Sequence, residues 1–263
     1  MRPKKRLGQH FLRDPRILAR IADALDPTAR DTVVEIGPGP GGLTAELASR
    51  AGRVIAIEKD RDLARTLVGR FPNVEVAEAD ALELDWPGLA GGPFLVAGNI
   101  PYNITSPLID KALMPPRPAR VVFLVQREVA DRLAGAPGSA DYGALTVGVQ
   151  AVARVERLLR VPAGAFFPPP RVDSAVVRLT PLAQPLVEDR QVPAFRRTVV
   201  GLFGYRRKQL ARAVRELTGW NAGRAGQALA AVAIDPSLRP EALAPPEFVA
   251  LHRTLVDGGW PGD

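Results

Sequence analysis

The sequence predicts an α/β fold, a mainly parallel sheet covered by helices on both faces, followed by a small helical domain. Three observations lead to this prediction. Short β-branched runs alternate with segments of helical composition, which is typical of βαβ units. A glycine-rich segment, which is common where a strand turns into a helix, follows the first predicted strand. Beyond residue 181 the pattern is helical throughout.

The first elements begin after a basic N-terminal segment. Asp14 followed by Pro15 is typical of a helix N-cap and first turn, so we expect a helix that runs to about Leu25. Five strands with helices between them should follow. The expected strands are Thr32 to Ile36, Arg53 to Glu58, Val74 to Ala79, Phe94 to Gly98 and Val121 to Gln126, and the expected helices between them include Leu43 to Ala51 and Asp62 to Arg70.

The pattern changes after Ala153. Two strand-like runs, Arg154 to Val161 and Val172 to Leu179, are joined by a proline-rich link that is too short for a crossover helix, so we expect antiparallel neighbours. We predict two domains, residues 1–182 and 183–263, with a linker near residues 181–191. The helices expected in the second domain are Val192 to Phe203, Arg207 to Thr218, Ala222 to Val232 and Pro246 to Val256.

Composition limits the possible chemistry. The chain has 263 residues, a formal charge of +7, no cysteine and two histidines. Disulfides, thiolate nucleophiles, iron–sulfur clusters and cysteine-based zinc sites are therefore excluded, and we expect no metal. Because no apolar run approaches the roughly 20 residues that span a bilayer, and the N-terminus lacks the apolar part of a signal peptide, we expect a cytoplasmic protein that contacts no membrane. We separately expect a monomer. The positive charge favours nucleic acid as a partner.

The sequence EIGPGPGG, from Glu35 to Gly42, lies where the strand should turn into a helix, and doubly wound sheets bind nucleotides at that place. Gly37, Gly39 and Gly41 would allow the backbone to come close to a ligand. The glycine spacing also fits the dinucleotide fingerprint, and Glu58 lies near the distance expected for a ribose-binding acid. A nicotinamide or flavin dinucleotide therefore competes with S-adenosylmethionine (SAM) as the ligand.

Three features favour SAM. Pro38 and Pro40 lack the amide hydrogens that could bind a pyrophosphate, whereas SAM carries no phosphate. Asp80, at the end of the third strand, could accept a hydrogen bond from an adenine 6-amino group, and the antiparallel pair departs from the usual dinucleotide-binding sheet. A structural role competes for each acid taken alone: a solvated strand end for Glu58 and an N-cap for Asp80.

The segment Asn99-Ile100-Pro101-Tyr102 follows the fourth strand at the same edge of the sheet. It suits methylation of the adenine 6-amino group, a poor nucleophile for which positioning must supply much of the rate. The side-chain oxygen of Asn99 and the carbonyl of Pro101 could accept the two amine hydrogens and turn the lone pair toward a methyl group. Tyr102 could stack on the base and stabilise the developing positive charge. The alternative is a tight turn with a structural proline.

The segment from Phe166 to Ser174, FFPPPRVDS, could supply a second aromatic wall for a base that has left its stack. Its prolines would stiffen the loop and present a phenylalanine. The alternative is that Phe166 and Phe167 both belong to the core. We expect one of them to face the site and the other to face the core.

Taken together, these segments resemble the ribosomal RNA adenine dimethyltransferases, and most closely the small-subunit (16S) family associated with kasugamycin sensitivity. The resemblance extends in order over most of the chain. The matching segments are LGQHFLRD (residues 7–14), VVEIGPGPGGLT (33–44), AIEKD (56–60), EADAL (78–82), GNIPYNITSPL (98–108), VQREVADRL (125–133), YGALTV (142–147), FFPPPRVDSAVVRL (166–179) and FGYRRKQL (203–210).

The resemblance implies a Rossmann-like class I SAM-dependent methyltransferase sheet. It implies two methyl transfers from SAM to each of two adjacent adenosines near the 3′ end of 16S rRNA, within a pre-assembled small ribosomal subunit, and it permits a role in subunit assembly. The family often has Asn where this chain has His10. The implied roles are His10 and Leu12 near the methionine part of SAM, Gly37 in the glycine loop, Glu58 on the ribose, Asp80 on the adenine, Asn99 between cofactor and target, and Tyr102 and Phe166 around the target base.

A basic run extends from Arg196 to Arg215 and contains no acidic residue. Arginine side chains suit phosphate contacts, so we expect Arg206, Arg207 and Lys208 to contact RNA. Two alternatives stay open. One is a large-subunit rRNA adenine methyltransferase of the antibiotic-resistance type, and the other is a non-catalytic RNA-binding assembly factor.

Overall fold

The computed structural model describes residue 4 and residues 9–261. Leu7 and Gly8, from the first segment of the family resemblance, lie outside these residues. The chain divides into two compact units: unit 1 contains Met1–Ala130 and Val155–Pro181, and unit 2 contains Asp131–Arg154 and Leu182–Asp263. Residues 131–154, which the sequence analysis assigns to the first domain, therefore group with the second unit.

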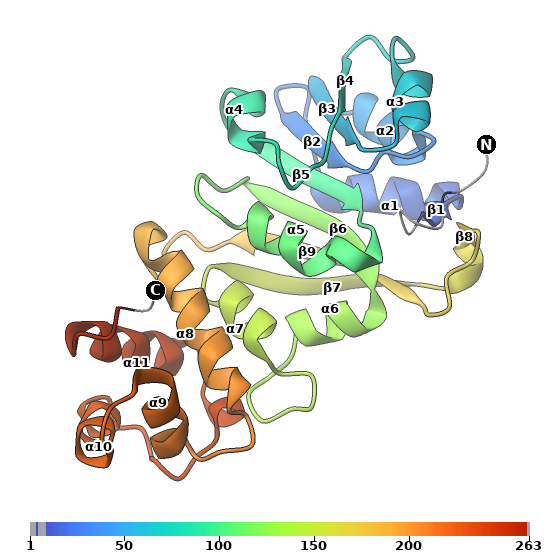
Figure 1. Cartoon of the computed structure of the whole chain (residues 1–263). Coiled ribbons are helices and arrows are strands. Elements are labelled where there is room, and N and C mark those ends of the chain that lie inside the picture. Colours follow the sequence, from blue (N-terminus) through green and yellow to red (C-terminus); the bar gives the residue numbers. More distant parts are fainter. Residues whose placement is uncertain (1–3, 5–8, 262–263) are drawn as a thin grey trace. The chain divides into compact units, whose positions relative to one another are not determined.

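The central feature of unit 1 is a seven-stranded mixed sheet (Figure 1), which confirms the α/β prediction. Its strand order is β4-β3-β2-β5-β6-β9-β7. The first five strands in this order are parallel, whereas β9 runs antiparallel to β6. The strands are β2 (Thr32–Ile36), β3 (Arg53–Glu58), β4 (Val74–Glu78), β5 (Phe94–Asn99), β6 (Arg120–Gln126), β7 (Ala153–Val161) and β9 (Ser174–Pro181).

A two-stranded antiparallel sheet, which the sequence analysis did not anticipate, forms from β1 (Phe11–Leu12) and β8 (Phe166–Phe167). Phe11 is opposite Phe167, and Leu12 is opposite Phe166. This pairing attaches the N-terminal segment to the proline-rich loop that follows β8.

The helices of the described residues include the expected ones and four short additional ones, α4 to α7. Asp14 caps α1 by accepting a hydrogen bond from the Arg16 amide, as the sequence predicts. The helices are α1 (Pro15–Leu25), α2 (Gly42–Ala48), α3 (Arg61–Leu67), α4 (Trp86–Ala90), α5 (Thr105–Ala112), α6 (Arg127–Leu133), α7 (Ala144–Gln150), α8 (Val192–Gly204), α9 (Leu210–Thr218), α10 (Ala222–Ala231) and α11 (Pro245–Asp257).

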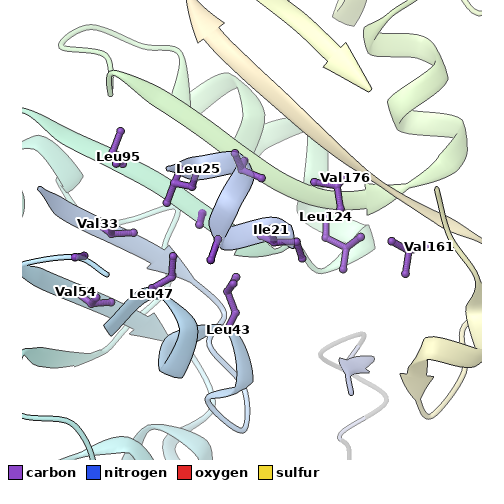
Figure 2. Packing of buried hydrophobic residues seen from close by; sticks show 14 of the residues in the cluster. Ile21, Leu25, Val33, Leu43, Leu47, Val54, Leu95, Leu124, Val161 and Val176 are labelled. Carbon is purple, nitrogen blue, oxygen red and sulfur yellow. The ribbon is translucent and has the colours of Figure 1, made fainter. Parts of the chain in front are cut away.

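The core of unit 1 explains why the strands read as continuous apolar runs. Helices α1 and α2 pack on the sheet, and their side chains Ile21, Leu25 and Leu47 are completely buried with strand residues such as Val33 and Leu124 (Figure 2). Parallel strands covered on both faces lose the alternation of apolar and polar residues. The rigid sheet fixes the positions of the loops at its carboxyl edge.

Unit 2 is mainly helical and has its own core. The Phe203 and Phe248 rings stack with centroids 5.5 Å apart, and the buried Tyr142 hydroxyl donates to the Leu243 carbonyl at 2.7 Å. Helix α9 begins at Leu210 rather than at Arg207, because the Lys208 amide bonds to the Tyr205 carbonyl and closes a turn first. Among the described residues, every helix is too short or too polar to cross a bilayer.

Candidate active site

The candidate site is a cavity of about 200 Å³ in unit 1, at the carboxyl ends of the parallel strands. This is the edge at which doubly wound sheets bind their ligands, because loops from several strands meet there. The residues that line it and that the sequence analysis selected are His10, Gly37, Gly39, Glu58, Asp80, Asn99, Pro101 and Tyr102. The structure thus brings most of the expected site residues together.

Glu58 fixes the glycine loop to the end of β3. Its two carboxylate oxygens accept hydrogen bonds from the amides of Gly39, at 3.1 Å, and Asp60, at 2.8 Å. Gly39 has a φ of +57°, and an added Cβ there would lie 3.1 Å from the Phe11 ring, so glycine suits this position. Burial raises the pKa of Glu58, although the amide hydrogen bonds oppose this effect. Only 6% of Glu58 is exposed, and the residue lines the cavity.

Asp80 has the N-cap role that the sequence analysis gave as its structural alternative, and it also lines the cavity. One carboxylate oxygen accepts from the Leu82 amide at 2.9 Å and caps the following turn. The other accepts from the Lys59 ammonium group at 2.6 Å. The hydrogen bond from Lys59 lowers the pKa of Asp80, so Asp80 is a charged acceptor. Both Asp80 and Lys59 line the cavity.

The orientation of the Asn99 amide is set by the backbone of His10. The nitrogen Nδ2 donates to the His10 carbonyl at 2.7 Å. Because a carbonyl can only accept, the amide nitrogen must face His10, and the oxygen Oδ1 is left as the acceptor. The His10 ring is itself held, since Nδ1 bonds to the Pro168 carbonyl at 2.8 Å. The contribution of His10 to Asn99 is thus made by its backbone, which any residue at that position could supply.

Tyr102 is held from two sides. Its hydroxyl lies 2.8 Å from the hydroxyl of Ser174, a buried residue at the start of β9. Its ring stacks with the His10 ring at a centroid distance of 5.6 Å and an interplanar angle of 22°. Burial raises the pKa of Tyr102, so the phenol stays protonated at neutral pH. The antiparallel strand β9 therefore brings Ser174 to the site and fixes the plane of the Tyr102 ring.

Replacing Ser174 with alanine should slow methyl transfer about fivefold, the rate equivalent of roughly 1 kcal/mol for one hydrogen bond. Tyr102→Phe removes the same bond and should have a similar effect. If Ser174 acts only through Tyr102, the double variant will be no slower than either single variant in single-turnover measurements. Multiplied losses in the double variant would contradict this assignment.

A second cavity, of about 450 Å³, is also lined by the glycine loop in unit 1. Asn99, Gly37, Gly39 and Phe11 line both cavities, so the two meet at the end of β5. The other residues of the second cavity are Leu12, Arg13, Leu18, Glu35, Pro38, Pro40, Gly42, Leu43, Arg70 and Phe167. Four of the expected cofactor residues, Leu12, Gly37, Gly39 and Asn99, are therefore found here, whereas the expected residue Gly41 lines neither cavity.

The structure distinguishes the two phenylalanines of the proline-rich segment. Phe166 is 4% exposed and belongs to the hydrophobic core of unit 1, and it lines neither of these cavities. Phe167 is 43% exposed and lines the second cavity with Asn99. Consecutive residues of a strand point to opposite faces, and β8 therefore sends one ring into the core and the other outward. The expectation that Phe166 lies at the site is not met; Phe167 is there instead.

Glu35 is a second buried acid, and the sequence analysis assigned it no role. Glu35 is among the residues that line the second cavity, and its buried oxygen Oε2 has no hydrogen-bond partner. Burial raises its pKa to about 8, and the nearby charge of Glu58 adds to the effect. Glu35 is therefore mostly protonated in the folded protein at neutral pH.

This shift predicts a specific pH dependence of stability. An unfolded chain releases the Glu35 proton near the ordinary pKa of 4.5, whereas the folded chain keeps it up to about pH 8. The contribution of Glu35 to stability therefore falls as pH rises from 4.5 to 8 and is level above that. In the ligand-free protein, Glu35→Gln should be more stable than the wild type at pH 8, by on the order of 3 kcal/mol, and similar to it below pH 4.5.

Denaturant unfolding across this pH range measures the effect. Glu83→Gln, at an exposed acid, is the matched control and should change little. A constant difference between Glu35→Gln and wild type at all pH values would show that Glu35 titrates alike in both states.

The basic residues expected to contact RNA lie in unit 2, in the turn between α8 and α9. Arg207 and Lys208 are exposed, and Arg206 lies 3.5 Å from the Glu241 carboxylate. In α9, Arg212 pairs with Glu216 at 3.2 Å. The exposed cations Arg207 and Lys208 are thus available for phosphate contacts.

Comparison with known proteins identifies the family to which this site belongs. Residues 1–235 match the model of the family described as "Ribosomal RNA adenine dimethylase". The chain belongs to this family. It is accordingly an rRNA adenine dimethyltransferase with the Rossmann-like fold of class I methyltransferases, as the resemblance implies.

Relatives and solved structures agree with this family membership. The relatives include two proteins named "Ribosomal RNA small subunit methyltransferase A". The one from Rubrobacter xylanophilus is 46% identical and covers 97% of this chain and 95% of the relative. The one from Pelotomaculum thermopropionicum is 43% identical and covers 98% of this chain and 92% of the relative. A dimethyladenosine transferase from Plasmodium falciparum superposes with a TM-score of 0.83 at 26% identity, covering 95% of this chain and 99% of that one. The 23S rRNA methyltransferase ErmE superposes with a TM-score of 0.71 at 32% identity, covering 94% of this chain and 99% of that one.

Four features of this adenine dimethylase site were missed by the sequence analysis: the hydrogen bond from Asn99 to the His10 carbonyl, Ser174, Glu35 and the guanidinium of Arg13, whose carbon lies 4.0 Å from the centre of the Phe167 ring. Glu35 precedes the glycine loop, where an acid in an apolar strand is a usable signal. The other three depend on contacts between segments distant in sequence, for which a single sequence carries no signal.

Proposed function

We propose that this enzyme transfers methyl groups from SAM to the 6-amino groups of two adjacent adenosines near the 3′ end of 16S rRNA, within the small ribosomal subunit. The observation that carries the proposal is Asn99, whose oxygen is left as an acceptor beside a cavity that contains Glu58 and Asp80. The small subunit as substrate is supported by the names of relatives that match over nearly their whole length. We propose a role in subunit assembly on the same basis.

The cavity residues fit SAM. Glu58 would accept the ribose hydroxyls, and Asp80 would accept the adenine amine. Gly37 and Gly39 allow close approach of the backbone, while Pro38 and Pro40 provide no amide for a phosphate. Gly41 is not part of this fit, because it packs against Leu67, which an added Cβ would meet at 2.6 Å. The methionine part would extend toward the backbone of His10 and Leu12. When bound, SAM supplies an electrophilic methyl group.

The chain's own residues position the amine. Asn99 Oδ1 and the Pro101 carbonyl would each accept one amine hydrogen, which turns the nitrogen lone pair toward the methyl group. The Pro101 carbonyl accepts from the Ile104 amide at 3.2 Å. The Thr105 hydroxyl lies 3.2 Å from the same oxygen and 3.3 Å from the Tyr102 carbonyl, so when it donates to Tyr102 one lone pair of the Pro101 carbonyl is available for the amine. The π face of Tyr102 stabilises the positive charge that develops on nitrogen, and the extra proton then leaves to water.

We assign the RNA contact to unit 2, which includes the predicted RNA-contacting domain of residues 183–263, and the catalytic site to the predicted domain of residues 1–182. Arg206, Arg207 and Lys208 would bind phosphates, which makes the affinity for the ribosomal particle fall steeply with salt. The monomeric state and the cytoplasmic location stay predictions.

Supplying the wild-type protein with methyl-labelled SAM and undermethylated small ribosomal subunits tests the proposal. We expect label in dimethyladenosine at two adjacent positions of 16S rRNA, and little label in naked large-subunit RNA supplied in parallel. Absence of label from the small subunit would overturn the proposal. Label confined to large-subunit RNA would instead support the antibiotic-resistance type of activity.

A further inference from the structure

Phe167 presents an aromatic ring to water beside the candidate site. Its partner in β8, Phe166, fills the core, and the strand geometry leaves Phe167 outside, 43% exposed. The ring is not alone, because the guanidinium carbon of Arg13 lies 4.0 Å from its centroid. A planar cation stacked on an exposed aromatic ring forms a flat, positively charged surface.

Several contacts hold this surface in place. The Arg13 amide donates to the Ala165 carbonyl at 2.9 Å, immediately before β8. Three successive prolines follow Phe167 in the chain, and the carbonyl of the first, Pro168, is hydrogen-bonded to the His10 ring. The surface is therefore ordered before a ligand arrives, which reduces the entropy lost on binding.

The surface is continuous with the reaction centre. Arg13, Phe167 and Asn99 line the same cavity of about 450 Å³. Asn99 also lines the cavity that holds Glu58 and Asp80. A nucleic acid strand with one base at Asn99 can therefore place a neighbouring base at Phe167.

We propose that Phe167, with Arg13 stacked on it, is the platform for the base of the adenosine next to the one being methylated. The inference rests on the proposed function, in which the target base leaves its stack and so deprives its neighbour of a stacking partner. The exposed part of the Phe167 ring replaces that partner, and Arg13 supplies hydrogen-bond donors for the phosphate between the two nucleosides. The platform therefore holds the neighbouring adenosine on one side of the target base while the target reacts.

Binding of short single-stranded RNAs tests the platform. The probe contains two adjacent adenosines. Each comparison RNA keeps one adenosine and has an abasic site in place of either its 5′ or its 3′ neighbour. With S-adenosylhomocysteine present, the wild type should bind the intact probe about 10-fold more tightly than one of the abasic RNAs. Phe167→Ala should lose this preference, and Phe167→Trp should keep it.

Val172→Ala is the matched control, because Val172 is an exposed apolar residue of the same loop, 47% exposed, and should retain the full preference. Arg13→Ala should weaken binding of intact and abasic RNAs alike. A wild type without a preference, or a Phe167→Ala variant that keeps it, would overturn the platform. Methylation of small subunits by the wild type is measured separately, so that failure of the platform and failure of the proposed function are distinguished.

Discussion

Replacing Asn99 with alanine should lower the rate of methyl transfer by about 10²- to 10³-fold. The structure fixes the amide with its nitrogen on the His10 carbonyl, so that Oδ1 accepts a hydrogen of the incoming amine. Without this acceptor the lone pair of a weak nucleophile is no longer directed at the methyl group, and errors of position of about 1 Å can cost 10²-fold. Single-turnover transfer of labelled methyl groups to undermethylated small subunits measures the loss.

Affinity for SAM should change only a few-fold in this variant, because Glu58 and Asp80 stay in place. The matched control is Gln227→Ala, which removes an amide side chain from an exposed position of α10, outside the lining of the cavity. We expect less than about a threefold effect on its rate, since the Asn99 acceptor is intact. An Asn99→Ala enzyme within tenfold of wild type would show that the Asn99 side chain does not position the amine.

Replacing Glu58 with alanine should weaken SAM binding by about 10²-fold, because two kinds of contact are lost together. The carboxylate would no longer accept the ribose hydroxyls, and it would no longer anchor the Gly39 amide that shapes the glycine loop. Hydrogen bonds to charged groups contribute roughly 1.5–3 kcal/mol each. Calorimetric titration with SAM measures the change, and Glu58→Gln, which keeps the acceptor oxygen, should lose less.

Glu78→Ala provides the control for this experiment. Glu78 is the register partner of Glu58 on the neighbouring strand β4, and its side chain is 50% exposed. The two substitutions therefore remove the same carboxylate at the same level of the sheet, but only Glu58 lines the cavity. Comparable affinity losses in both variants would mean that general charge, rather than contact with the ligand, explains the effect.

The parallel strands could be predicted because their signal is local. The structure gives β2 and β3 the bounds that the sequence predicts, Thr32–Ile36 and Arg53–Glu58. In each case a β-branched apolar run is long enough to be buried, and a glycine loop or an N-cap such as Asp60 ends it. The expectation that the two late strands lie side by side is also confirmed, since β9 and β7 are neighbours in the sheet.

The missing elements are those with weak local signals. Strands β1 and β8 contain two residues each, too few for a recognisable alternation, and they exist because segments over 150 residues apart in sequence meet. The short helices α4, α6 and α7 have five to seven residues and depend on packing rather than on propensity.

The sequence by itself determined the chemistry of this enzyme. The residue types at Gly37, Glu58, Asp80, Asn99 and Tyr102 define which donors and acceptors a ligand can meet, and their places after successive strands put them at one edge. Only the tertiary structure decided how these groups are aimed. The Asn99 amide is oriented by a carbonyl 89 residues away, the Tyr102 ring by a hydroxyl 72 residues away, and the choice of Phe167 over Phe166 by pairing with β1. Hydrogen bonds and strand register are properties of two segments at once, and neither segment specifies them alone.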